Sequence, residues 1–68
     1  MNDDTLNMEV RKYLKKVGIT SQREIEYAVR KAVESGLLNG TETLEAHMTL
    51  SVPALKIDLK IDGQIALD

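Results

Sequence analysis

The N-terminal quarter of the chain has the apolar spacing of an amphipathic helix. Its apolar residues recur every three or four positions: Leu6, Val10, Leu14 and Val17. This spacing places them on one face of an α-helix. Acidic residues come before basic ones in the segment, which is the order that the helix dipole favours. The pattern predicts a helix over residues 3–17 that ends at a left-handed Gly18.

A second helix is predicted over residues 21–35. Ser21-Gln22-Arg23-Glu24 has the spacing of a capping box, in which the serine and the glutamate each bind a free amide of the first turn. Its apolar face comprises Ile25, Ala28, Val29, Ala32 and Val33. Gly36 is expected to end this helix. The two helices would then form a hairpin joined through Gly18-Ile19-Thr20.

After Gly36 the apolar period changes from about 3.6 to two residues. Between Leu44 and Val52 the even-numbered residues are apolar and the odd-numbered ones are polar. After Pro53-Ala54 the apolar residues are the odd-numbered ones, from Leu55 to Ile61. Such alternation is typical of strands that have one face on a core and the other in water. We therefore expect strands over residues 43–52 and 55–61.

The turns decide how these strands pair. Opposing Val52 with Leu55 and Leu50 with Ile57 would keep the apolar residues on one face, through either a tight hairpin or a bulge at Pro53-Ala54. At Asp62-Gly63 a three-residue loop with a left-handed glycine would oppose Lys60 with Gln64 and begin a third strand over 64–68. The expected fold class is α+β: an N-terminal helical hairpin on one face of a three-stranded antiparallel meander (αα-βββ), in a single domain over 1–68.

Composition narrows the classes of function. The chain has 68 residues, no cysteine, one histidine and a net charge of −2. Without thiols, a disulfide framework and a cysteine-ligated zinc site are excluded. No apolar run approaches a membrane span, and the acidic start Met1-Asn2-Asp3-Asp4 is unlike a secretory signal. We expect a cytoplasmic protein that does not bind membranes.

Candidate chemistry is sparse. His47, the only histidine, is expected on the polar face of the first strand, near Glu45 and opposite Lys60. It lacks the partners of a catalytic triad or a metal site. The segment from Asp58 resembles the start of a calcium loop, but Lys60 takes the place of its second oxygen ligand. The sequence predicts no catalytic residues, no metal and no cofactor, and hence no enzyme.

A winged-helix DNA-binding protein is the alternative interpretation. Its recognition helix would be the one at 21–35, with four polar or basic residues as candidate nucleic-acid contacts: Gln22, Arg23, Arg30 and Lys31. Against it, Glu24 occupies a position that is usually apolar in such motifs, and the third helix of the trihelical core is missing. The acidic side chains of this helix would also face phosphates unfavourably. Nucleic acid is therefore not the expected partner.

Several short segments together resemble a known family. They are Asn7-Met8, Lys15-Lys16-Val17-Gly18, Ser21-Gln22-Arg23-Glu24-Ile25-Glu26, Gly40 with Glu42-Thr43-Leu44, Met48-Thr49-Leu50, and Asp62-Gly63 with the final Ile65-Ala66-Leu67-Asp68. The chain is similar over its whole length to a family of short bacterial proteins classified as a domain of unknown function. This resemblance implies a bacterial, cytoplasmic origin and supplies no mechanism. We expect a non-enzymatic protein-interaction or self-association module, with a protein partner or a homodimer formed at the edge of strand 43–52.

Overall fold

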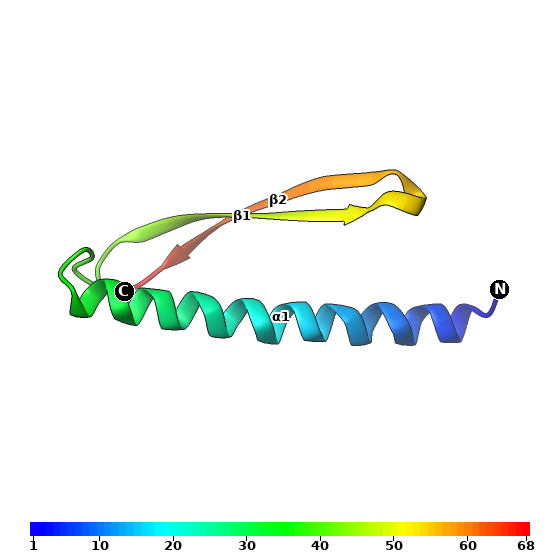
Figure 1. The fold of residues 1–68 in the computed structure, drawn as a ribbon, viewed down its shortest axis with the longest axis horizontal. Coiled ribbons are helices and arrows are strands. Elements are labelled where there is room, and N and C mark those ends of the chain that lie inside the picture. Colours follow the sequence, from blue (N-terminus) through cyan, green and yellow to red (C-terminus); the bar gives the residue numbers. More distant parts are fainter. The chain divides into compact units, whose positions relative to one another are not determined.

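The computed structural model describes residues 1–68 and contains four elements (Figure 1). They are helix α1 (Asp3–Glu34), strand β1 (Thr43–Val52), the short 3-10 helix η1 (Pro53–Leu55) and strand β2 (Ile57–Ala66). The chain divides into two compact units, Met1–Leu37 and Leu38–Asp68. The first unit contains α1, and the second is an antiparallel two-stranded ribbon. The predicted helical hairpin with a three-stranded meander is therefore wrong, although the chain does combine helix and sheet.

Helix α1 has a defined cap at each end. The Asn2 side chain accepts a hydrogen bond from the Thr5 amide at 3.0 Å, and acidic Asp3 and Asp4 occupy the first turn. At the other end, the Ser35 amide donates to the Lys31 carbonyl at 3.0 Å, and Gly36 adopts a φ of +81°. A glycine reaches this left-handed conformation without the steric cost of a Cβ. The prediction that Gly36 ends the helix is confirmed.

The predicted break at Gly18 is wrong, because α1 runs through it for 32 residues without interruption. Gly18 has no left-handed φ, and Ser21 lies inside the helix instead of capping a new one. The physical reason is the apolar spacing, since Leu14, Val17 and Ile25 stay on one face when the helix continues, with the small Ser21 between them. An interior glycine costs only about 1 kcal/mol relative to alanine. That cost is small beside losing the hydrogen bonds of a helical turn.

The ribbon confirms the first predicted strand and corrects the other two. β1 covers residues 43–52 as expected, and β2 is one strand where two were predicted. Gly63 lies opposite Ala46 in the middle of the pairing and has no left-handed φ, so Asp62-Gly63 is not a turn. The odd-numbered apolar positions continue through Gly63 to Ile65. Because a turn would interrupt both this alternation and the ladder of hydrogen bonds, the extended strand is favoured.

The strands are joined by residues 53–56, and Val52 pairs with Ile57 rather than with Leu55. Proline has the φ that the first position of a 3-10 turn requires, and the Lys56 amide donates to the Pro53 carbonyl at 3.1 Å. Lys56 then takes a left-handed φ of +57° and returns the chain to the ribbon. A four-residue connection pairs even positions of β1 with odd positions of β2. This explains why the apolar parity changes at Pro53.

Candidate functional site

One face of the ribbon is apolar along its whole length. The pairs on this face are Leu44–Ile65, Ala46–Gly63, Met48–Ile61, Leu50–Leu59 and Val52–Ile57. We call these ten residues the apolar ribbon face. None of them is buried: Met48 is 42% exposed, Leu59 53% and Ile61 52%. An apolar surface of this extent is typical of an interaction site in a soluble protein.

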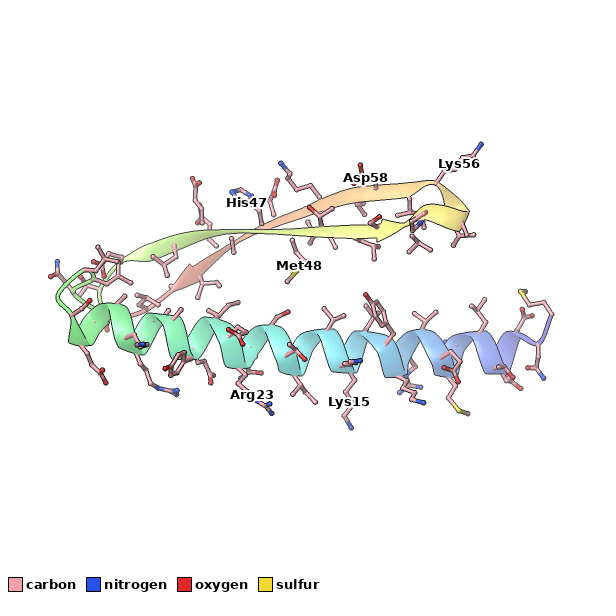
Figure 2. All side chains as sticks on the ribbon, in the orientation of Figure 1. Lys15, Arg23, His47, Met48, Lys56 and Asp58 are labelled. Atoms are coloured by element: carbon pink, nitrogen blue, oxygen red, sulfur yellow. The ribbon has the colours of Figure 1, made fainter.

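The opposite face of the ribbon is polar and carries the only histidine. His47 and Met48 project to opposite sides of β1 in Figure 2, as expected for adjacent strand residues. His47 lies opposite Asp62, not opposite Lys60 as predicted, because the four-residue connection 53–56 pairs Val52 with Ile57 and shifts the register by two residues. Its Nδ1 lies 2.7 Å from an Asp62 carboxylate oxygen, and its Nε2 lies 3.9 Å from a Glu45 oxygen. All three side chains are exposed, and no group of three potential ligands is arranged to hold a metal ion.

The loop before β1 is held by one carboxylate that the sequence analysis missed. The Glu42 side chain accepts hydrogen bonds from the amides of Asn39 at 2.8 Å, Gly40 at 2.9 Å and Thr41 at 3.1 Å. These amide donors, that of Asn39 most strongly, hold the pKa of Glu42 below its ordinary value of 4.5. The Asn39-Gly40 pair and an acidic residue two positions later were the available signal for this loop.

Both long edges of the ribbon lack a partner strand, because the sheet contains only β1 and β2. The Leu67 amide donates to the Glu42 carbonyl at 3.0 Å, which makes Glu42 and Leu67 a hydrogen-bonded pair. Hydrogen-bonded and non-hydrogen-bonded pairs alternate along an antiparallel ladder. It follows that the residues of the apolar ribbon face direct their amides and carbonyls toward the partner strand. The polar positions, including Lys60 and Asp62 of β2, direct their amides and carbonyls to the open edges.

Helix α1 has its own apolar stripe. Its least exposed residues are spaced three or four apart, and none is fully buried: Val17, Ser21, Ile25, Val29 and Ala32. Between Val10 and Arg23 the helix also carries five basic residues and no acidic one. Lys15 and Arg23, from this basic stretch, project from one side of α1 (Figure 2).

The four candidate nucleic-acid contacts all lie on α1, but they do not share one face. Arg23 and Arg30 are seven positions apart and therefore lie on the same side. The Gln22 amide donates to Glu26 at 3.1 Å, Arg30 lies 3.8 Å from the same carboxylate, and the Lys31 ammonium lies 5.2 Å from the centre of the Tyr27 ring. The helix-turn-helix interpretation requires a turn at Gly18, and α1 has none.

Comparison with known proteins places the whole chain in one family. The model of a family of unknown function (DUF6494) matches residues 1–68, so the chain belongs to that family. No curated protein and no solved structure matches it. In the structure, neither helix combines the length and apolar character needed to span a membrane.

Proposed function

We propose that this protein is a non-enzymatic self-association module, in which a second copy of the chain helps to cover the apolar surfaces. The observation that carries the proposal is that neither unit buries a side chain within itself. Each unit presents an ordered apolar surface, the ribbon face in one and the α1 stripe in the other. A protein of this size needs a buried core to offset the entropy of folding.

The isolated elements also need additional contacts. A two-stranded ribbon is only marginally stable in water, and a sheet gains independent stability from a third strand or a packed helix. Most of the stability of a protein helix likewise comes from packing of its apolar face. Turn and cap hydrogen bonds such as those of Asn2 and Glu42 hold local geometry, but they bury no apolar area. The apolar surfaces remain the main available source of stability.

The first test is the mass of the wild-type chain in solution. Size exclusion with light scattering, together with sedimentation equilibrium across the micromolar range, is expected to give a dimer or a larger assembly. The melting temperature should rise with protein concentration, because association stabilises only the folded chain. A folded monomer with a concentration-independent melting temperature would contradict the proposal.

A matched pair of variants locates the surface. Met48→Glu places a charge on the apolar ribbon face, and Thr49→Glu places the same charge on the polar face opposite Lys60. We expect Met48→Glu to weaken association strongly. The variant should then be either a folded monomer or an unfolded chain, and circular dichroism distinguishes the two. Thr49→Glu should leave the wild-type mass unchanged. If Met48→Glu associates as the wild type does, the ribbon face is not part of the interface.

A further inference from the structure

The open edge of β2 carries charges of alternating sign. Asp58, Lys60 and Asp62 occupy successive polar positions of the strand, and these are the positions whose backbone groups point to the open edge. All three side chains are exposed. When a strand pairs with a copy of itself, such a pattern attracts in some registers and repels in others.

The registers can be compared one by one for an antiparallel pair related by a two-fold axis. An axis at Lys60 would oppose the two lysines and place Asp58 opposite Asp62 of the second copy. An axis at Asp62 would oppose the two Asp62 carboxylates. Like charges directly opposite one another are destabilising. An axis at Ile61, in contrast, places Lys60 of each copy opposite Asp62 of the other.

We propose that a second copy adds to the open edge of β2 as an antiparallel strand in the register centred on Ile61. The product is a four-stranded sheet in the order β1–β2–β2–β1, with both apolar ribbon faces on the same side. This inference rests on the proposed self-association and specifies its geometry. Two symmetric Lys60–Asp62 ion pairs select the register, and backbone hydrogen bonds of the open edges hold the strands together.

The length and shape of β2 agree with this register. The axis at Ile61 lies near the middle of Ile57–Ala66 and pairs residues 57–65 of the two copies. It places Leu59 of each copy opposite Gly63 of the other, where no Cβ competes for space and no atom lies within 4 Å of the position a Cβ would take. An axis at Leu59 also opposes unlike charges, but it pairs only residues 57–61 before the strand ends.

The edge of β1 has no comparable pattern. Its polar positions carry only Glu45 and His47 as ionisable groups, and the other three are Thr43, Thr49 and Ser51. Registers that pair the full length of β1 are centred on His47 or Met48 and bring no opposite charges together. Charge complementarity therefore favours β2 over the β1 edge that the sequence analysis suggested.

Charge reversal tests the ion pairs. Lys60→Glu makes the two cross-chain pairs both acidic, and Asp62→Lys makes them both basic. Each variant alone should raise the dissociation constant of the dimer roughly tenfold or more at low salt. An equimolar mixture should recover wild-type association as a heterodimer, because each pair then joins opposite charges. A matched control, Lys56→Glu, has the same charge change as Lys60→Glu but lies before β2, outside the residues 57–65 that this register pairs, and should associate as the wild type does.

Disulfide trapping tests the register itself. The wild-type chain has no cysteine, so Ile61→Cys introduces the only thiol. In the proposed register the two Ile61 positions form a non-hydrogen-bonded pair with Cα atoms about 4.5 Å apart, which a disulfide can bridge. Ile61→Cys should form a covalent dimer on mild oxidation. Leu59→Cys should not, because its copies lie about 13 Å apart along the strands.

The outcomes separate this inference from the proposed function. A wild-type chain that stays monomeric overturns both. A wild-type assembly that is unaffected by Lys60→Glu and Asp62→Lys and is not trapped by Ile61→Cys overturns only the β2 register. Trapping by Leu59→Cys, without trapping by Ile61→Cys, would replace it with the register centred on Leu59.

Discussion

Two glycines lie inside regular elements of this protein, and two lie in the connection between α1 and β1. Gly18 of α1 and Gly63 of β2 have no left-handed φ, whereas Gly36 and Gly40 have φ values of +81° and +94°. All four have open space where a Cβ would be, so crowding does not distinguish them. The distinguishing property is the apolar pattern around each one. It continues across Gly18 and Gly63, and it ends at Gly36.

The comparison shows when the chain turns at a glycine or proline and when it continues the same element. Around Gly18 the residues Leu14, Val17 and Ile25 keep the helical spacing, with only the small Ser21 between them. At Gly63 the two-residue alternation of Ile61 and Ile65 is also uninterrupted. At Pro53 the parity of the alternation changes, and there the chain does turn. A glycine or proline ends an element where the apolar period also changes.

The largest expected effect comes from proline at Gly18. Inside a helix, proline removes a hydrogen bond and clashes with the preceding turn, so Gly18→Pro should lower the free energy of unfolding by about 3 kcal/mol or more. Asp3→Pro is the control, since Asp3 is the first helical residue and its predecessor Asn2 is extended. Urea unfolding at one fixed protein concentration measures both. Equal tolerance of the two prolines would place a turn at Gly18.

Alanine at the helical and the terminal glycine should have opposite effects. Gly18→Ala is expected to raise the free energy of unfolding by about 1 kcal/mol, because it reduces the entropy of the unfolded chain. Gly36→Ala should lower it by about 1 kcal/mol, because alanine is strained at a left-handed φ. Urea unfolding at one fixed protein concentration measures both changes. A loss of stability in Gly18→Ala would contradict the continuous helix.

A smaller effect is expected in the ribbon. Gly63→Ala should raise the free energy of unfolding by about 0.5 kcal/mol, since glycine inside a strand is unfavourable and the Cβ would meet no atom of its own chain. A left-handed glycine in a turn would instead make the same substitution destabilising. Thermal unfolding of this variant and the wild type, at matched concentrations, shows whether the substitution raises or lowers the stability.

The smallest expected effect concerns the Glu42 loop and is visible through its pH dependence. The pKa of Glu42 is lower in the folded chain than its ordinary value of 4.5, so its carboxylate stabilises the fold above about pH 4.5. That contribution is lost as the pH falls through the lowered pKa. The wild type should therefore exceed Glu42→Gln in stability at neutral pH, and the difference should disappear in acid. Amide proton shifts of Asn39, Gly40 and Thr41 should titrate with the same midpoint.

The parts of the fold that could be predicted are those in which one periodicity dominates. The start of the helix at residue 3, the glycine that ends it and the bounds of β1 all follow from spacing and cap residues. The Ser21–Glu24 capping pattern and the Asp62-Gly63 pair each predict a boundary, although both are compatible with a continuing element. The apolar surface was predictable as a set of residues. The cross-strand partner of His47 was not, because it depends on the length of the connection between β1 and β2, which is four residues and not two.

The sequence by itself determined which residues share a face, because the periods of helix and strand follow from backbone geometry and local sterics. It therefore specified an apolar stripe, an apolar strand face and a polar remainder without a catalytic set. Only the structure decided that α1 is continuous and that Val52 pairs with Ile57. The helix is continuous because its own hydrogen bonds outweigh the turn signal of Gly18. The strand pairing depends on hydrogen bonds between residues far apart in the chain, such as Glu42 with Leu67, which no local pattern encodes.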